Sequence, residues 1–206
     1  MDIRSVGVVG AGQMGVGIAQ VFAQAGYSVV LNDISAEALE AARASIDNGL
    51  ARLVEKGRMA PDEHKAVIDR LRLETDLTRL GKSDLIVESA TEKEAVKVEI
   101  FRTLLPHLAE GTILTTNTSS ISITRLASTT DRPERFMGLH FMNPVPVMSL
   151  VELIRGIATD DATFQTMKGV VDKLGKTAAV AEDFPAFIVN RILLPMINEA
   201  IYTLYE

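Results

Sequence analysis

The chain has 206 residues, 47% hydrophobic and 23% charged, and its 21 Lys and Arg against 27 Asp and Glu give a formal net charge of −6 at pH 7. This composition excludes disorder, and a negative balance without a run of Lys or Arg argues against nucleic acid or an anionic membrane surface as partner. The absence of Cys excludes disulfides, thiolate metal sites and a cysteine nucleophile, and we expect no metal.

The chain opens without a signal-peptide pattern, and no apolar stretch reaches the length of about 18 residues that a membrane span needs. We therefore expect a cytoplasmic protein that does not bind a membrane. From residue 5 onward, short apolar runs that predict strands alternate with apolar residues at helical spacing that predict helices. The expected strands are residues 5–9, 27–31, 71–74, 84–88, 112–115, 136–140, 147–154 and 177–181. The expected helices are residues 14–25, 35–56 (with Ser35 as N-cap), 61–71, 92–108 and 161–174.

Alternating strands and helices of this length indicate βαβ units. We therefore expect a doubly wound α/β fold, a Rossmann-type parallel sheet buried on both faces. The composition changes after Pro185, where residues 187–205 read as one helix that is apolar on more than one face. A surface helix keeps one polar face, so this helix should be buried on several sides. We expect residues 185–206 to be the first helix of a truncated helical domain, or a helix completed by another chain.

A glycine-rich turn follows the first predicted strand. Residues 10–15 read Gly-Ala-Gly-Gln-Met-Gly and open a predicted helix, which is the context that makes a G-x-G-x-x-G pattern informative. Gly10 allows the tight turn, Gly12 lets the backbone approach a pyrophosphate, and Gly15 lets the helix lie close to the sheet. The free N–H groups at the helix start, where Gln13 and Met14 lie, would bind the phosphates. A plain turn without a ligand is the alternative.

The second predicted strand leads to Asp33, 18 residues beyond Gly15. A carboxylate at this position can accept hydrogen bonds from the ribose hydroxyls of adenosine, and it repels a 2′-phosphate. No Arg follows within the next few positions to bind such a phosphate. The sequence therefore predicts NAD, and not NADP, as the cofactor, and residues 1–184 as an NAD-binding domain.

Of the three histidines, one lies where chemistry is expected. His64 and His107 lie among polar residues on predicted helix surfaces, and we expect them to be solvated. His140 ends an apolar strand, and ligands of an open parallel sheet bind beyond the carboxyl ends of its strands. An imidazole there can exchange a proton with an alcohol near neutral pH. Glu152 lies inside the next apolar strand, where an unpaired carboxylate is costly, so we expect it to hydrogen-bond the imidazole.

A polar segment, Asn117-Thr118-Ser119-Ser120, directly follows the strand predicted over residues 112–115. It places an amide and several hydroxyls at the same edge of the sheet as His140. Helix capping by Ser120 or Ser122 is the alternative for the hydroxyls.

Four segments together carry a family resemblance that spans nearly the whole chain. They are residues 9–19 (VGAGQMGVGIA), 117–126 (NTSSISITRL), 135–156 (RFMGLHFMNPVPVMSLVELIRG) and 184–197 (FPAFIVNRILLPMI). On these motifs the sequence resembles the L-3-hydroxyacyl-CoA dehydrogenases, and most closely the bacterial 3-hydroxybutyryl-CoA dehydrogenases. The resemblance implies reversible NAD-dependent oxidation of an (S)-3-hydroxyacyl-CoA, with an acyl group of four carbons expected.

The resemblance also assigns roles to residues. It implies that His140 is the acid–base, that Glu152 is its partner, and that Ser119 and Asn190 hydrogen-bond the oxygen on the third carbon of the substrate. The positions that match the nicotinamide half of the family's cofactor site are Glu92, Lys97, Asn117 and Asn143. Asp33 matches the carboxylate that binds the adenosine ribose.

Two basic residues, Arg52 and Lys56, fall where the family's long helix offers charge to coenzyme A phosphates, and a solvated helix face is the alternative. The chain departs from the family pattern at Ala186, where the family commonly has Gly. It departs also in length, since the family continues into further helices that complete a dimerisation domain. We expect a homodimer where that domain is complete.

The same sequence excludes one other function and leaves two open. The short-chain reductase route needs Tyr-x-x-x-Lys, and none of Tyr27, Tyr202 and Tyr205 has a Lys four residues on, so this route is excluded. Two alternatives stay open: a related dehydrogenase of a sugar acid such as L-gulonate, and a truncated, non-catalytic dinucleotide-binding module.

Overall fold

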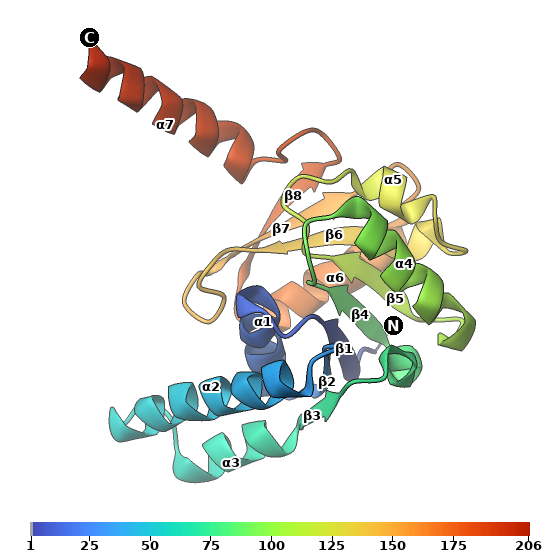
Figure 1. The fold of residues 1–206 in the computed structure, drawn as a ribbon, viewed down its shortest axis with the longest axis vertical. Coiled ribbons are helices and arrows are strands. Elements are labelled where there is room, and N and C mark those ends of the chain that lie inside the picture. Colours follow the sequence, from blue (N-terminus) through green and yellow to red (C-terminus); the bar gives the residue numbers. More distant parts are fainter. Residues whose placement is uncertain (1) are drawn as a thin grey trace.

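The structure is a computed structural model that describes residues 2–206. Its centre is one eight-stranded sheet in the order β3-β2-β1-β4-β5-β6-β7-β8 (Figure 1). The strands are β1 (Ser5–Val9), β2 (Ser28–Asn32), β3 (Leu71–Glu74), β4 (Leu85–Glu88), β5 (Ile113–Thr116), β6 (Phe136–Phe141), β7 (Leu150–Arg155) and β8 (Thr177–Glu182). The predicted doubly wound α/β fold is confirmed.

Helices connect the strands and cover both faces of the sheet. They are α1 (Gln13–Gln24), α2 (Ala36–Glu55), α3 (Pro61–Asp69), α4 (Glu94–Leu104), α5 (Ile123–Ala127), α6 (Asp161–Lys173) and α7 (Val189–Tyr205). Three short 3₁₀ helices are η1 (Leu77–Lys82), η2 (Leu105–His107) and η3 (Pro133–Arg135). Ser35 caps α2 as predicted, its hydroxyl accepting the N–H of Ala38 at 3.1 Å.

Two apolar clusters form the core, one on each face of the sheet. Residues of α1, α2, α3 and α6 pack on one face, and residues of α4 and α5 pack on the other. Strand β6 serves both clusters, because successive side chains of a strand point to opposite faces. Met137 and Leu139 belong to the first cluster and Phe136 to the second, and every residue of β6 is buried.

The sheet is parallel except where β7 runs antiparallel to β6. This differs from the uniform parallel sheet that the strand–helix alternation predicted. Parallel neighbours need a crossover of a dozen or more residues, and residues 142–149 contain no helix, so the chain turns back directly. The backbone N–H groups of Val147 and Met148 both donate to the carbonyl of Pro144 in this turn. For this reason β7 begins at Leu150, and not at Val147 as predicted.

Helix α7 projects away from the sheet and its covering helices (Figure 1). None of its residues is buried, although it carries many large apolar side chains. Those exposed are Ile192, Leu193, Leu194, Met196, Ile197, Ile201, Tyr202, Leu204 and Tyr205. Within residues 2–206, no helix combines the length and the apolar character that crossing a membrane requires.

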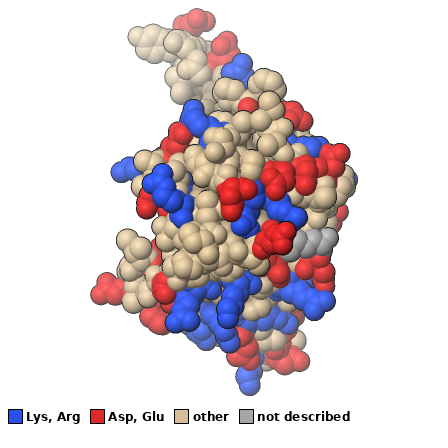
Figure 2. Space-filling model, turned by 90° about the vertical axis from the view of Figure 1, so that its right-hand side faces the viewer, with Lys and Arg blue, Asp and Glu red and all other residues tan. Residues whose placement is uncertain are grey.

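Charges of both signs are interspersed on the side of the molecule that carries α4 and η1. Figure 2 shows Lys and Arg side chains beside Asp and Glu side chains over this face, with uncharged surface between them. Such mixing is typical of a solvated surface.

Candidate active site

The glycine turn between β1 and α1 has the geometry of a phosphate cradle. Gly10 has φ +101°, a backbone conformation that L side chains rarely adopt, and a Cβ there would lie 2.6 Å from the carbonyl oxygen of Ser89. A Cβ at Gly15 would collide with the carbonyl oxygen of Gly10. Gly12 has no neighbour within 4 Å of its ideal Cβ position, and it precedes α1 without a side-chain cap. The backbone is therefore closely packed at Gly10 and Gly15. The space at Gly12, beside the helix N-terminus, is open, as a pyrophosphate requires.

Asp33 lies beside this turn, just after β2. Its Oδ2 accepts the N–H of Ala11 at 2.8 Å, and its Oδ1 accepts the N–H of Ser35 at 3.0 Å. Each carboxylate oxygen has a second lone pair, so the half-buried side chain can still accept ribose hydroxyls. The turn and Asp33 together fit the pyrophosphate and adenosine ribose of NAD.

His140 and Glu152 face each other across the antiparallel pair β6–β7, in direct register. Nδ1 of His140 lies 2.6 Å from Oε2 of Glu152, and the two residues are 8% and 0% exposed. The other oxygen, Oε1, accepts the backbone N–H groups of Ile188 and Val189 at 2.9 and 2.8 Å. Glu152 therefore binds the imidazole and the start of α7 at once.

The charge state of Glu152 follows from these contacts. Burial alone would raise the pKa of this carboxyl, but the hydrogen bonds from His140, Val189 and Ile188 together hold its pKa below the ordinary value. Glu152 is then ionised and accepts only, so Nδ1 of His140 carries the proton of the shared hydrogen bond. Nε2 is the imidazole nitrogen left for a ligand.

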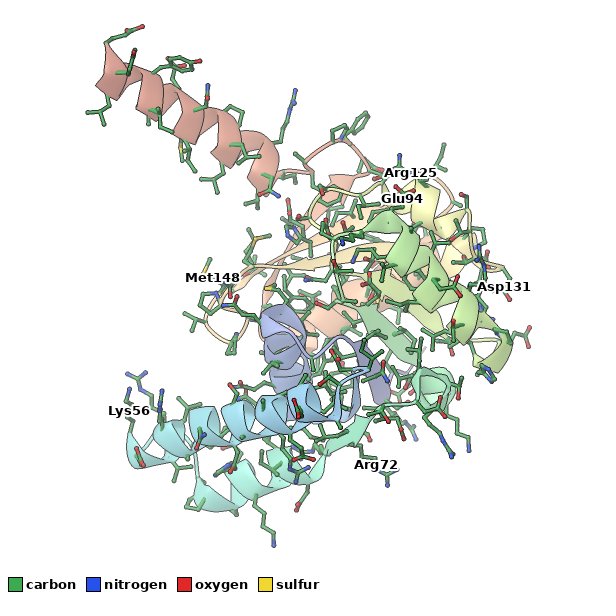
Figure 3. All side chains as sticks on the ribbon, in the orientation of Figure 1. Lys56, Arg72, Glu94, Arg125, Asp131 and Met148 are labelled. Carbon is green, nitrogen blue, oxygen red and sulfur yellow. The ribbon has the colours of Figure 1, made fainter. Side chains whose placement is uncertain are left out.

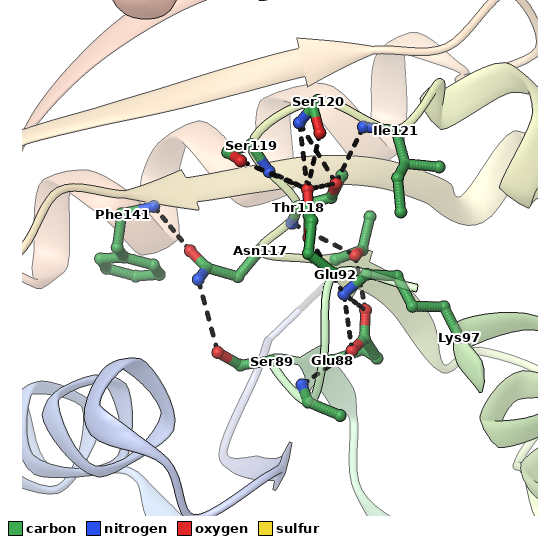
Figure 4. A network of polar contacts seen from close by, with 12 residues as sticks. Glu88, Ser89, Glu92, Lys97, Asn117, Thr118, Ser119, Ser120, Ile121 and Phe141 are labelled. Atoms are coloured by element: carbon green, nitrogen blue, oxygen red, sulfur yellow. Dashed lines mark hydrogen bonds and ion pairs between the residues drawn. The ribbon is translucent and has the colours of Figure 1, made fainter. Parts of the chain in front are cut away.

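Glu92 organises the polar segment after β5 (Figure 4). Its Oε1 accepts the hydroxyl of Thr118 at 2.5 Å, the N–H of Ser119 at 2.9 Å and the N–H of Ser120 at 3.2 Å. Burial would raise the pKa of Glu92, and these hydrogen bonds with the nearby Lys97 ammonium lower it overall. Of the two serines considered as a helix cap, Ser122 caps α5 and Ser120 contacts Glu92.

Two asparagines join separate elements at this edge. Asn117 accepts the N–H of Phe141 at 2.8 Å and donates to the hydroxyl of Ser89 at 3.4 Å, and so connects β5, β6 and β4. Asn190 lies in the first turn of α7 and donates to the carbonyl of Ser119 at 3.3 Å. The C-terminal helix thereby reaches the polar segment despite its exposure.

Lys97 pairs with Glu88, a carboxylate that the sequence analysis did not single out. Nζ of Lys97 lies 2.7 Å from Oε2 of Glu88, and both residues are buried. The signal for Glu88 was present in the sequence: like His140, it is a polar residue at the carboxyl end of an apolar strand.

A cavity of about 690 Å³ brings most of these groups together. Its wall contains predicted site residues from the glycine turn and the start of α1, the segments that follow β4, β5 and β6, and the elements α4, β6 and α7. They are Gly12, Gln13, Met14, Glu92, Lys97, Asn117, Ser119, His140, Asn143 and Asn190. Glu152 lies behind His140. Gly10 and Gly15 are part of the glycine turn, and Asp33 lies beside that turn. A larger hollow of about 1120 Å³ lies beside β3 and η1, and no predicted site residue lines it.

Arg52 and Lys56 are not part of this cavity. Both are exposed near the C-terminal end of α2, and Figure 3 shows Lys56 at the outer tip of that helix. Met148, from the turn between β6 and β7, lines the cavity and lies on the same side of the molecule as α2 and α7 in this view.

Comparison with known proteins identifies relatives over the whole chain. The sequence model described as 3-hydroxyacyl-CoA dehydrogenase, NAD binding domain, matches residues 5–184. A 3-hydroxybutyryl-CoA dehydrogenase of Bradyrhizobium diazoefficiens is 60% identical over 204 residues, which cover 99% of this chain and 70% of that protein. One of Clostridioides difficile is 41% identical, with 94% and 69% covered. The crystal structure of (S)-3-hydroxybutyryl-CoA dehydrogenase from Ralstonia eutropha superposes with a TM-score of 0.94 at 45% identity, covering 97% of this chain and 70% of that one.

Proposed function

Because the chain belongs to the 3-hydroxyacyl-CoA dehydrogenase family, we propose that it catalyses the reversible oxidation of an (S)-3-hydroxyacyl-CoA to the 3-ketoacyl-CoA. We propose 3-hydroxybutyryl-CoA as the substrate, since relatives with that name match nearly the whole chain. The observation that carries the proposal is the His140–Glu152 pair, whose imidazole lies in the wall of the same cavity as the start of α1.

The cofactor in this proposal is NAD. When bound, it supplies the acceptor for the hydride that leaves the third carbon of the substrate. The turn from Gly10 to Gly15 would hold the pyrophosphate and Asp33 the adenosine ribose. Four residues would line the nicotinamide half: Glu92, Lys97, Asn117 and Asn143.

His140 is the acid–base of the proposed reaction. Glu152 keeps the proton of the imidazole on Nδ1, so Nε2 is free to accept the proton of the substrate hydroxyl. The imidazolium that forms is stabilised by the buried carboxylate beside it. In the reverse direction the same imidazolium donates its proton to the keto oxygen.

Ser119 and Asn190 act on the same oxygen in the proposal. Both line the cavity with His140, from two elements that are far apart in the sequence. A hydroxyl and an amide N–H aimed at an oxygen that gains negative charge stabilise the transition state more than the ground state. Binding both reactants in one cavity also makes hydride transfer effectively unimolecular, worth up to about 7–11 kcal/mol.

The remaining assignments concern the outer parts of the chain. We propose that residues 1–184 are the cofactor domain and that residues 185–206 begin a helical domain whose further helices cover the apolar side chains of α7. A homodimer formed through that domain belongs to the same proposal. We propose that Arg52 and Lys56 bind coenzyme A phosphates, because both side chains are exposed and positively charged.

The test is an assay of NADH oxidation with acetoacetyl-CoA and with longer 3-ketoacyl-CoAs. We expect turnover with acetoacetyl-CoA, and tighter binding of NADH than of NADPH because Asp33 repels a 2′-phosphate. Activity on L-gulonate without any on acetoacetyl-CoA would refute the proposed substrate. NADH binding without turnover of any 3-ketoacyl-CoA would indicate a binding module instead.

A further inference from the structure

Glu88 is a buried carboxylate to which the proposed mechanism gives no role. It ends β4, between Val9 of β1 and Thr116 of β5, and it is 0% exposed. Its Oε1 accepts the N–H of Ala90 at 2.8 Å and Nζ of Lys97 at 2.9 Å. Its Oε2 accepts Nζ of Lys97 at 2.7 Å and the hydroxyl of Thr116 at 2.6 Å. A carboxylate offers about four lone-pair sites, so every one is used and the group is held from all sides.

Lys97 extends this anchor into the wall of the cavity. Its side chain is 2% exposed, yet it contributes to the cavity lining together with Glu92. Nζ lies 3.7 Å from Oε2 of Glu92, too far for a direct hydrogen bond but close enough for attraction between the buried ammonium and this partly exposed carboxylate. The two short hydrogen bonds to Glu88 therefore determine where the ammonium lies.

Glu92 connects the ammonium to the segment after β5. One of its oxygens faces Lys97, and the other accepts the N–H and, at 3.3 Å, the hydroxyl of Ser119. Figure 4 shows the resulting chain of contacts, from Glu88 through Lys97 and Glu92 to the segment that contains Ser119. Hydrogen bonds join Glu88 to Lys97 and Glu92 to Ser119, and the contact between Lys97 and Glu92 is electrostatic.

Stability alone does not account for such a pair. Removing two charges from water offsets much of their attraction, and apolar residues of similar size often stabilise a protein as well or better. Charge-assisted hydrogen bonds do provide a fixed direction, because they are short and strong. Such hydrogen bonds suit a group that must occupy a fixed position for the reaction.

We propose that Glu88 is a positioning residue of this active site, which fixes Lys97 and, through Glu92, the backbone of the segment that contains Ser119. The inference rests on the proposed function, and it adds a residue that contacts neither substrate nor cofactor in that mechanism. Without the charge of Glu88, Glu92 becomes the nearest carboxylate to the Lys97 ammonium. The ammonium then moves toward Glu92 and weakens the hydrogen bonds of Glu92 to residues 118–120.

The first experiment compares Glu88→Gln with Glu94→Gln. Both replacements keep the size of the side chain and remove one negative charge, but Glu94 lies on the surface of α4, where it pairs with Arg125 (Figure 3). We expect kcat per folded molecule to fall about 10- to 100-fold in Glu88→Gln, with a smaller change in KM for acetoacetyl-CoA, because a misplaced group impairs the reaction more than binding. The control should match the wild type. Equal kcat in all three proteins would overturn the proposal.

A double variant, Glu88→Gln with Lys97→Met, separates positioning from folding. It removes both buried charges, so we expect it to recover the thermal stability that Glu88→Gln loses. We expect kcat to stay low, since the positioned ammonium is gone. If kcat recovers together with thermal stability, Glu88 and Lys97 form a purely structural pair and the proposal is overturned.

The ratio of the dissociation constants for NAD⁺ and NADH gives a readout independent of turnover. Glu88→Gln removes a negative charge near the expected place of the nicotinamide, whose ring is cationic only in NAD⁺. We expect NAD⁺ binding to weaken more than NADH binding, and the ratio to return toward the wild type in the double variant. Equal weakening of the binding of both ligands would overturn the proposal.

A wild type that binds NADH but does not reduce acetoacetyl-CoA would refute the proposed function alone. The ratio of the two dissociation constants would still decide the role of Glu88.

Discussion

The sheet and helix α7 differ in where their apolar side chains lie. All residues of β6 are buried, because helices of the same chain cover both faces of the sheet. No residue of α7 is buried, although its sequence is as apolar as that of a core element. The sheet region therefore completes its own core, whereas the fold of α7 depends on its connection to that region and on whatever covers it. The candidate active site therefore spans a part of the chain that completes its own core and a part that does not.

The two regions meet at Glu152 and at residues 183–188. Glu152 divides its oxygens between His140 and the first N–H groups of α7. Asp183 accepts the N–H groups of Ile123 and Thr124 at 2.9 and 2.8 Å, and so binds the segment before α7 to the start of α5. Four changes at and around this junction distinguish what each region contributes.

Replacing His140 with alanine tests the sheet region alone. We expect kcat to fall roughly 10²- to 10⁴-fold because the proposed acid–base is lost, while NADH affinity persists because the glycine turn is untouched. His107→Ala is the matched control, since His107 is exposed and outside the cavity. Stopped-flow or steady-state oxidation of NADH measures the effect, and near-normal turnover of His140→Ala would remove this residue from the mechanism.

Replacing Glu152 with glutamine affects both regions. The amide oxygen can still accept the N–H groups of Ile188 and Val189, but the amide NH₂ then faces Nδ1 of His140 and favours the tautomer with the proton on Nε2. We expect kcat to fall on the order of 10²-fold, with the start of α7 still in place. NMR of the imidazole nitrogens reports the tautomer directly. An unchanged tautomer with unchanged kcat would contradict the role given to Glu152.

Acid should weaken the junction through Asp183. Burial raises the pKa of this carboxyl, but hydrogen bonds from Ser122, Thr124 and Ile123 outweigh it and lower the pKa below its ordinary value of 3.8. A carboxyl whose pKa is lower in the folded state stabilises the protein above its unfolded pKa, and this contribution is lost as pH falls through the folded pKa. We expect Asp183→Asn to lose about 1 kcal/mol at neutral pH, as when other side chains that accept the first N–H groups of a helix are replaced, and to depend less on pH in the acid range. Urea unfolding at several pH values measures both, and parallel pH profiles of variant and wild type would contradict the prediction.

Ala186→Gly should have the smallest effect, and a favourable one. Ala186 has φ +69° and Phe187 has φ +50°, so two successive residues occupy the left-handed region that favours glycine. Relief of this strain is partly offset by the greater freedom of glycine in the unfolded chain, and we expect a gain of up to about 1 kcal/mol. Ala41→Gly is the control, since Ala41 is exposed in the interior of α2, where glycine should only lose stability. A destabilised Ala186→Gly would mean that the junction carries no such strain.

Much of the sheet region follows from local sequence signals. The glycine turn, the cap at Ser35 and the alternation of strands and helices each depend on residues close together in the chain, and the structure contains them all. The pairing of His140 with Glu152 could be predicted because a buried carboxylate needs a partner, and the structure adds the reason: a direct turn places the two residues in register.

What could not be predicted depends on contacts between distant segments. The antiparallel direction of β7 follows from the missing helix in residues 142–149, a signal that the alternating pattern obscured. The short helix α5 has too few residues for a periodic pattern, and it begins where Asp183, 60 residues away from Ile123, accepts its N–H groups. Glu88 belongs to the same class, since its partners come from α4 and β5. Ala186 was noted as a departure from the family pattern, and the structure supplies its backbone angle.

The two amides that bind Glu152 bear on where a fragment of this chain could be cut. The family match ends at residue 184, which suggests a convenient boundary for expressing the nucleotide-binding part by itself. A protein cut there would lack the N–H groups of Ile188 and Val189, and one oxygen of a fully enclosed carboxylate would lose both of its donors. A fragment intended for ligand screening or for grafting onto another helical unit should therefore extend past Val189, so that the imidazole partner keeps its native setting.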